Sequence, residues 1–237
     1  MNSHGRPNLA LVVARGGSKS LPRKNLAPLA GRPLIAWTIA AALRCRDLDR
    51  VVVSTDDDEI AAVSRTLGAE VPFLRPPELA EDGTPTMPVI VHALHWLEEE
   101  QGYLPDAVVL LQPTSPLRTA DDITGAIALA RERSADSVIS VSLARSHPHL
   151  AKRIAGDGRL EEFMAHPRVD RRQDLEPVYS LNGAIYLARR GPLIENETLY
   201  GPNTYAYVMP PERSLDVDSA WDLHLCDLIL RDMYGSG

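Results

Sequence analysis

Short apolar runs alternate along the chain with stretches in which apolar residues recur at helical spacing. The runs at residues 9–14, 51–54, 71–74, 107–111, 137–141, 183–188 and 205–208 are predicted to form strands. The stretches at residues 33–45, 57–67, 87–100, 120–133 and 220–233 are predicted to form amphipathic helices. Since the strands are apolar throughout, we expect both faces of the sheet to be buried. Repeated alternation of strand and helix predicts an α/β fold with a doubly wound, mainly parallel sheet.

Three expected helix starts carry a hydroxyl residue followed three positions later by an acid, the pattern of a capping box. These pairs are Thr55 with Asp58, Thr119 with Asp122, and Ser219 with Asp222. Pro33 suits the first turn of the helix that follows it. These signals support the expected helix boundaries.

The alternation stops between residues 143 and 180, where the sequence carries turns and charges with little helical period. We interpret residues 143–180 as a small inserted subdomain. Residues 1–142 and 181–237 then form the main α/β domain.

The composition is that of an ordinary globular protein, with 44% hydrophobic and 24% charged residues in 237. A net charge of −7 argues against general nucleic-acid binding, which needs a basic face. The charge is unevenly spread, because residues 1–46 hold eight Lys or Arg and no Asp or Glu. We therefore expect an anion to bind near the N-terminal segment.

The two cysteines, Cys45 and Cys226, lack the spacing of a metal site or a redox pair. They are interpreted as buried, reduced thiols. The longest early apolar run, residues 9–14, is too short to span a bilayer or to serve as the apolar core of a signal peptide. No membrane partner is expected, and a cytoplasmic location is predicted.

The first expected strand leads into a loop that combines glycines with cations at the carboxyl end of a central strand, where α/β sheets bind ligands. Gly16 and Gly17 let the backbone approach an anion closely, and Arg15, Lys19 and Lys24 add positive charge. A phosphate is the expected ligand, and a solvated basic turn is the alternative. The loop is not a P-loop, because it does not follow the GxxxxGK[ST] pattern and Pro22 prevents an uninterrupted helix.

The loop sequence, Ala14-Arg15-Gly16-Gly17-Ser18-Lys19-Ser20-Leu21-Pro22-Arg23-Lys24-Asn25, resembles the signature of the acylneuraminate cytidylyltransferases. Six further blocks match this family in the same order, at residues 54–56, 74–80, 111–118, 147–148, 182–186 and 216–218. The resemblance implies a Rossmann-like nucleotidyltransferase fold. It also implies attack of the anomeric hydroxyl of a nonulosonic acid on the α-phosphate of CTP, which gives the CMP-sugar and pyrophosphate. The implied partners are CTP, an acid sugar and a second copy of the chain in a homodimer, which the inserted subdomain would help to form.

By this resemblance, the candidate nucleotide-binding residues are Arg15, Gly16, Gly17, Ser18, Lys19, Lys24, Asn25 and Arg75. Arg15 and Lys24, together with Asp218, are the candidate catalytic residues. Asn25 is the expected cytosine contact, because an amide can pair with the donor and acceptor of the cytosine edge. Satisfying a turn is the alternative role for this side chain.

Asp216 and Asp218 stand two apart, so in an extended segment both carboxylates face the same side. The resemblance assigns them a divalent cation, Mg²⁺ or Mn²⁺, for which hard oxygen ligands are suited. A pair of helix-capping acids is the alternative. Asp218 could also act as the base that deprotonates the attacking hydroxyl.

The candidate sugar-binding residues implied by the resemblance are Gln112, Lys152, Arg172 and Asn182. Gln112 is expected at the carboxylate of the sugar, whereas Arg118 is expected to hold the loop in place. Residues 147–152 look more like relatives that act on legionaminate or other bacterial nonulosonates. Two positions depart from the family pattern: Ser20 replaces a usual glycine, and Ser180 replaces an arginine found in several sialate-activating relatives.

Three alternatives remain open at the level of sequence. The first is a 3-deoxy-manno-octulosonate cytidylyltransferase, or a family variant that uses another nucleotide or sugar. The second is a metal-dependent glycosyltransferase of related architecture. The third is a nucleotide-binding module without catalytic activity.

Overall fold

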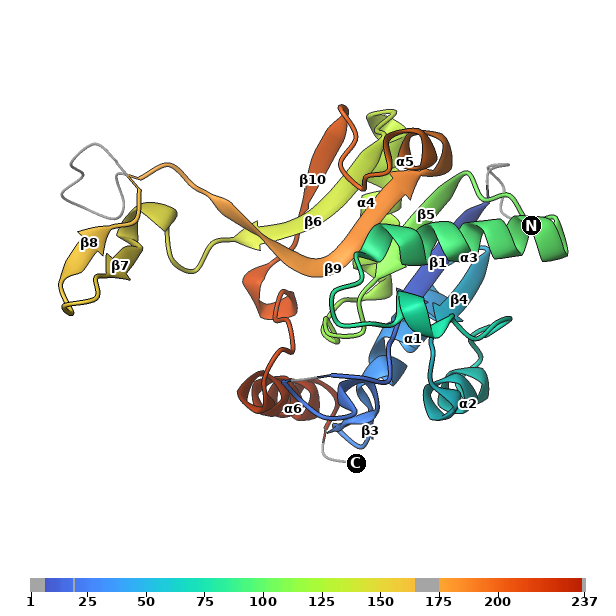
Figure 1. Cartoon of the computed structure of the whole chain (residues 1–237), viewed down its shortest axis with the longest axis horizontal. Coiled ribbons are helices and arrows are strands. Elements are labelled where there is room, and N and C mark those ends of the chain that lie inside the picture. Colours follow the sequence, from blue (N-terminus) through green and yellow to red (C-terminus); the bar gives the residue numbers. More distant parts are fainter. Residues whose placement is uncertain (1–6, 19, 165–174, 236–237) are drawn as a thin grey trace.

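The computed structural model describes residues 7–18, 20–164 and 175–235. A six-stranded sheet in the order β10-β6-β9-β5-β1-β4 forms its centre (Figure 1). The strands are β1 (Asn8–Val13), β4 (Arg50–Ser54), β5 (Ala107–Leu111), β6 (Ser137–Leu143), β9 (Tyr179–Arg189) and β10 (Thr204–Val208). β9 is antiparallel to both of its neighbours, and the other pairings are parallel. The predicted mainly parallel α/β sheet is confirmed.

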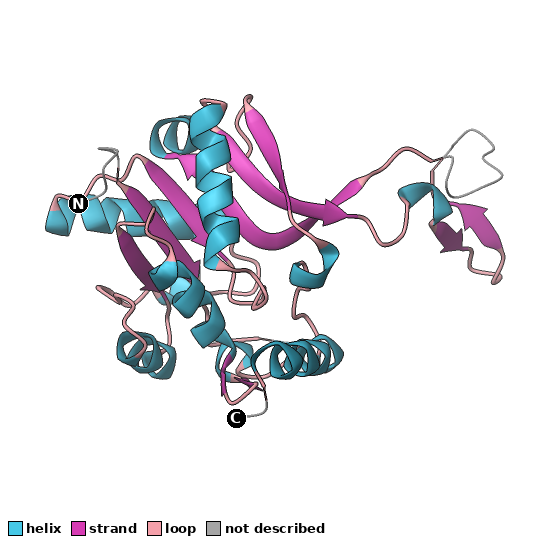
Figure 2. Cartoon of the chain, turned by 180° about the vertical axis from the view of Figure 1, so that it is seen from behind, coloured by secondary structure: helices cyan, strands magenta, loops and turns pink. Residues whose placement is uncertain are grey.

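Helices cover both faces of this sheet. The helices are α1 (Leu34–Arg44), α2 (Asp58–Thr66), α3 (Thr86–Gln101), α4 (Ala120–Glu132), α5 (Arg190–Asn196) and α6 (Ala220–Tyr234). Buried side chains of α1, α2 and α4 form one core cluster with the sheet, and this face is turned to the viewer in Figure 2. α3 and α5 contribute to a second cluster on the opposite face. The continuous apolar strands are thus buried on both sides, as their sequences predict.

A third apolar cluster joins the two ends of the chain. It combines α6 with Leu34 of α1 and with the hairpin of β2 (Pro28–Leu29) and β3 (Arg32–Pro33). Val217 lies in this cluster with no exposed surface. The packing therefore fixes the segment before α6 beside the N-terminal part of the chain.

Two local predictions are wrong. Residues 71–74 form no strand: one isolated bridge joins Val52 to Glu70, and the chain then leaves the sheet so that Phe73 packs on Trp96 of α3. Thr55 does not cap α2, because Asp57 lies closer to the helix and its carboxylate accepts from the first-turn amides. The capping boxes at Thr119 and Ser219 are confirmed.

The region predicted as an insertion forms an arm. β6 and β9 pair as far as Leu143 and Tyr179, and a short hairpin of β7 (Lys152–Ile154) and β8 (Leu160–Glu162) lies beyond them. Figure 1 shows this hairpin standing apart from the sheet and its helices. The sequence pattern did not predict the hairpin, because its apolar residues are exposed and do not alternate over a recognisable length.

Both cysteines are free and buried, as expected. Among the described residues, no helix is long and apolar enough to cross a membrane.

Candidate active site

A cavity of about 500 Å³ lies where β1 and β5 end. Its walls come from the N-terminal loop, from the segment between Arg75 and α3, from the residues that follow β5, and from Asp218. Of the candidate nucleotide and sugar residues, it is lined by Arg15, Gly17, Ser18, Lys24, Asn25, Arg75 and Gln112. The fold thus brings together segments separated by more than a hundred residues, at the edge of the sheet where α/β proteins bind ligands.

The N-terminal loop is held in place by acids from the segment after β4. The Gly16 amide donates to Asp56 at 3.1 Å, and a Cβ on Gly16 would lie 2.6 Å from the Asp57 carboxylate. Gly16 therefore serves close packing, and its amide is already used. Gly17 has open space around it, so this residue and Ser18 form the glycine-rich wall of the cavity.

Arg23 anchors the loop on its outer side. This residue adopts a left-handed backbone conformation, with φ 55°, and its guanidinium pairs with Asp57 and Glu59 of the α2 start. The contact lowers the pKa of Asp57. Ser20, which stands where the family usually has glycine, lines the cavity. Lys19 lies outside the described residues.

Lys24 joins the N-terminal loop to the segment before α6. Its Nζ donates to the Val217 carbonyl at 3.0 Å and lies 3.3 Å from a carboxylate oxygen of Asp218. Its side chain is only 14% exposed. Lys24 and Asp218 thus meet at the cavity, which both residues line.

Asn25 and Arg75 tie the floor of the cleft to the backbone. The Asn25 side-chain nitrogen donates to the Arg15 carbonyl at 2.9 Å. The nitrogen end of this amide therefore stabilises the loop. Arg75 is buried and donates to the carbonyls of Ser54 and Leu79. Burial lowers its pKa, although Asp56 lies 3.7 Å away. Both side chains still line the cavity.

Arg15 already has an acidic partner. Its guanidinium donates to a carboxylate oxygen of Asp82 at 2.6 Å, and both residues line the cavity. Asp82 was not singled out in the sequence, because no short-range pattern relates it to Arg15. The Asp82 carboxylate is therefore the negative charge that contacts Arg15, the residue expected to bind phosphate.

Asp216 carries an unsatisfied carboxylate oxygen. Its Oδ1 is buried and has no hydrogen-bond partner among the described residues. Burial raises the pKa of Asp216, a hydrogen bond from Thr114 opposes this shift, and the nearby charge of Asp218 adds to it. The Asp218 side chain is 77% exposed.

These two carboxylates are hard oxygen donors of the kind that a divalent cation binds. An orphaned buried oxygen and a second, solvent-facing carboxylate supply hard ligands in an arrangement that costs stability without a cation. Within the described part of the chain, no group of three or more His, Cys, Asp or Glu forms a complete metal cluster. Phosphate and water would therefore have to supply the remaining ligands, as is usual for Mg²⁺.

Gln112 is held at the end of β5 by its neighbours. Thr114 Oγ1 lies 3.5 Å from Gln112 Oε1, and a Cβ on Gly183 would lie 2.9 Å from the same oxygen. Gly183 has φ +72°, a conformation that favours glycine. Gly183 is a site residue that the sequence reasoning did not identify, although its place after Asn182 in a matched block was a usable signal.

Arg118 has the structural role expected of it. Its guanidinium is buried and donates to the carbonyls of Ala184 and Gln112 and to the Thr38 hydroxyl. Burial lowers its pKa to about 9. These contacts tie the turn after β5 to β9 and α1.

Two predicted sugar contacts lie away from this cleft. Asn182 is 4% exposed, and its amide is fully used by Ser140, Ser214, the Ala184 amide and the Met209 sulfur. It fixes β9 and leaves no donor or acceptor for a substrate.

Lys152 lies on the β7–β8 hairpin and pairs there with Glu162. Ser180 is exposed on β9 opposite Ser142. Arg172 lies outside the described residues. Of the candidate sugar contacts, Lys152 therefore lies in the described part of the arm and not in the cleft of the same chain.

Comparison with known proteins gives a consistent result. A family model described as cytidylyltransferase matches residues 9–204. CMP-N,N'-diacetyllegionaminic acid synthase of Legionella pneumophila is 37% identical over 94% of this chain and 95% of its own length. Pseudaminic acid cytidylyltransferase of Campylobacter jejuni is 29% identical over 94% of this chain and 96% of its own length.

An N-acylneuraminate cytidylyltransferase of Streptococcus agalactiae is 34% identical over 90% of this chain. The chain spans about half, 51%, of that relative's length. Among solved structures, CMP:2-keto-3-deoxy-manno-octonic acid synthetase complexed with CTP aligns with a TM-score of 0.72 at 16% identity, covering 96% of this chain and 99% of the other. This last likeness establishes the fold.

Proposed function

The chain belongs to the cytidylyltransferase family, and from that premise we propose that it joins the CMP group of CTP to a nonulosonic acid, with release of pyrophosphate. The observation that carries the proposal is the contact of Lys24 with Val217 and Asp218. This contact supports the proposal, because it joins the basic, glycine-containing loop to the segment that carries Asp216 and Asp218. A triphosphate and an attacking hydroxyl need both kinds of group.

The reaction is an in-line displacement at the α-phosphorus. The anomeric oxygen of the sugar forms a bond to phosphorus, the bond to the bridging oxygen of pyrophosphate breaks, and the hydroxyl proton leaves to a base. Arg15, Lys24 and the backbone at Gly17 and Ser18 are assigned to the phosphates, because they line the cavity and supply positive charge and amides. Their contribution is positioning and charge neutralisation in a confined site.

Asp216 and Asp218 would hold Mg²⁺ or Mn²⁺ when the nucleotide binds. The cation, when bound, neutralises phosphate charge and orients the leaving group. The orphaned Oδ1 of Asp216 supports this assignment. Asp218, exposed and within reach of Lys24, is also the candidate that accepts the hydroxyl proton.

The sugar substrate is assigned to the legionaminate-like class of nonulosonic acids. The Legionella relative, whose name gives it this product, covers nearly the whole chain. Gln112 is the proposed contact of the sugar carboxylate, because its amide is fixed at the end of β5 and lines the cleft. Ser180 in place of arginine is consistent with a substrate other than N-acetylneuraminate itself.

The function is tested by pyrophosphate release from purified protein with each of CTP, GTP, UTP and ATP. Each nucleotide is paired with a legionaminate, N-acetylneuraminate, 3-deoxy-manno-octulosonate or a neutral hexose, with and without Mg²⁺. We expect release with CTP and the legionaminate that depends on the cation and falls at least a hundredfold in Lys24→Ala. Arg46→Ala, at an exposed arginine outside the cleft, is the control. Preference for the octulosonate, for a neutral sugar or for another nucleotide would replace this assignment. CTP binding without release would leave only a binding module.

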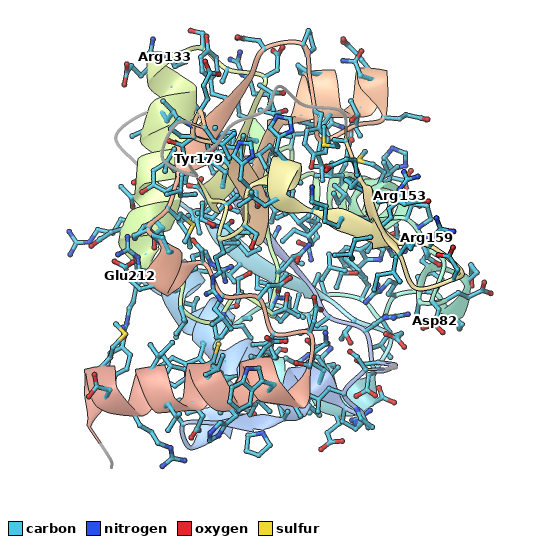
Figure 3. All side chains as sticks on the ribbon, turned by 90° about the vertical axis from the view of Figure 1, so that its left-hand side faces the viewer. Asp82, Arg133, Arg153, Arg159, Tyr179 and Glu212 are labelled. Carbon is cyan, nitrogen blue, oxygen red and sulfur yellow. The ribbon has the colours of Figure 1, made fainter. Side chains whose placement is uncertain are left out.

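We further propose that the arm forms a homodimer. Its exposed apolar side chains include Ile154 at 76% and Leu160 at 73% exposure, and Tyr179 is half exposed at the base of the arm. Figure 3 looks at this end of the molecule, where Arg153, Arg159 and Tyr179 are labelled. Ile154 and Leu160 are paired across the hairpin, so their exposed side chains are neighbours, and neighbouring exposed apolar side chains favour a protein–protein contact. Lys152, on the β7–β8 hairpin, would then serve the cleft of the partner copy.

Sedimentation of the wild type and of Ile154→Glu with Leu160→Glu tests this assembly. We expect a dimer for the wild type and a monomer for the double variant. Leu104→Glu, at an exposed leucine away from the arm, is the matched control and should remain dimeric. A monomeric wild type would overturn the proposal. The predicted cytoplasmic location stays a prediction.

A further inference from the structure

A second and larger cavity, of about 920 Å³, lies between α1, α6 and the turn after β5. It is close to the bottom of Figure 1, where α6 and β3 lie beside the C-terminus. None of its lining residues lines the nucleotide cleft. Its volume is in the range of small-molecule sites.

The cavity is lined by four arginines, Arg32, Arg44, Arg118 and Arg231, and by one acid, Asp121. This balance contrasts with the net charge of −7 of the whole chain. Arg231 pairs with Asp227, but Arg32 and Arg44 form no ion pair with any described residue. Positive charge that the fold leaves uncompensated around a cavity favours an anionic ligand.

Arg118 strengthens this field from within the wall. It is 3% exposed, its guanidinium donates to uncharged acceptors, and its Nε has no partner among the described residues. No described carboxylate contacts this guanidinium, although the charge of Asp122, which pairs with Arg213, attracts it from a distance. A buried cation of this kind is expensive unless an anion comes near it.

Aromatic side chains form another part of the wall. The rings of Trp37 and Tyr234 lie 5.6 Å apart at 35°, and the Arg32 guanidinium lies over the Trp37 ring at 5.5 Å. The Trp37 nitrogen donates to the Leu29 carbonyl, which fixes the ring. The site therefore pairs cationic groups with a flat apolar surface.

The two cavities share one wall. In the turn after β5, Gln112, Pro113 and Thr114 line the nucleotide cleft, whereas Pro116, Leu117 and Arg118 line the second cavity. Arg118 reaches through this wall, because its Nη1 donates to the Gln112 carbonyl. The cavity is therefore separate from the cleft but built onto the same rigid turn.

We propose that this cavity is a second ligand site, which binds a phosphorylated small molecule. Guanidinium groups bind phosphate in a bidentate manner. The arginines Arg32 and Arg44 contact the phosphate, and Arg118 contributes its charge from the wall. The Trp37 and Tyr234 rings contact the apolar part of the ligand.

The proposal is tested by calorimetric titration of the whole chain with inorganic pyrophosphate in the absence of divalent cation. We expect two classes of pyrophosphate site in the wild type. We expect one class in Lys24→Ala, in which binding at the cleft is weakened, and one class in the double variant Arg32→Ala with Arg44→Ala. Affinity at the second site should fall at least tenfold in the double variant. Both arginines are exposed, so folding is preserved, and Arg46→Ala controls for the loss of positive charge.

Titration of Lys24→Ala with AMP and with inorganic phosphate separates the two sources of a phosphate group. Tighter binding of AMP identifies a nucleotide, through the Trp37 and Tyr234 rings, and equal binding identifies the phosphate alone. A single class of site in the wild type would overturn the proposal. So would a double variant that binds pyrophosphate as Arg46→Ala does.

Discussion

Replacing Asp216 by asparagine should stabilise the free protein and remove its response to nucleotide and cation. In the wild type, the buried Oδ1 has no partner among the described residues, and Asp218 adds repulsion. A buried polar group without a partner costs about 1–3 kcal/mol. The asparagine keeps the shape and can still accept from Thr114, but its new NH₂ group also needs a partner. We therefore expect a net gain of about 1 kcal/mol, near the lower limit.

The assay is thermal unfolding at pH 7 without ligands. For a chain of this length, about 1 kcal/mol raises Tm by about 2–4 °C. Asp218→Asn is the control: its side chain is 77% exposed, so Tm should change little. Addition of CTP and Mg²⁺ should reverse the order, because the wild type gains about 2.7 kcal/mol at a hundredfold excess over Kd, whereas the variant has lost one cation ligand and binds more weakly.

The pH dependence has a defined sign. Because burial raises the pKa of Asp216, the folded protein holds this proton more tightly than the unfolded chain does. The destabilisation by the charged form is complete above the folded pKa, shrinks as the pH falls below it, and is gone below the unfolded pKa. The Tm difference between variant and wild type should therefore shrink on acidification. A variant that melts below the wild type at pH 7, or a difference that persists in acid, would refute the reasoning.

Three further substitutions probe the cleft and its support. Gly183→Ala should lower the unfolding free energy by about 1–2 kcal/mol in urea titrations, because its φ is +72°, and should raise KM for the acid sugar by displacing Gln112. An unchanged unfolding free energy together with an unchanged KM for the acid sugar would contradict the prediction for Gly183→Ala. Arg118→Ala should cost about 3 kcal/mol or more in the same titration, since buried acceptors lose a charged donor; a loss below about 1 kcal/mol would disprove it. Asp82→Asn should lower KM for CTP by up to about fivefold, because an exposed ion pair with Arg15 contributes up to about 1 kcal/mol. A raised KM would instead assign Asp82 a role in binding CTP.

The sheet could be predicted from sequence wherever a strand is buried on both faces. Residues 107–111 read as a continuous apolar run and are β5, with all five residues buried. Residues 71–74, Val-Pro-Phe-Leu, are also a short apolar run, but Phe73 is buried against α3 from a coil, and periodicity cannot distinguish the two. The β7–β8 hairpin was not predicted, because Ile154 and Leu160 are exposed and do not belong to an alternating apolar and polar pattern with one buried face.

The site could be predicted only in part. The basic loop and the aspartate pair were identified by chemistry and by resemblance, but the contact between Lys24 and Asp218 joins residues 194 apart in the sequence. A contact between residues this far apart leaves no pattern in the sequence around either of them. The Asp82 partner of Arg15 and the internal hydrogen bonds of Asn182 were missed for the same reason. The sequence of a matched block is the same whether its asparagine side chain contacts a substrate or is buried in the interior.

The antiparallel strand explains how one edge of the sheet carries both the cleft and the arm. Leu110 near the end of β5 pairs with Tyr186, and Leu143 at the end of β6 pairs with Tyr179. The earlier residues of β9 therefore lie beside the carboxyl ends of the parallel strands, where the cleft opens. Gly183 reaches Gln112 for this reason, and the arm extends from the same edge. A dimer formed through the arms would accordingly bring a second copy next to the substrate cleft, rather than to a remote face, so that assembly and sugar binding are expected to be lost together when the arm is altered.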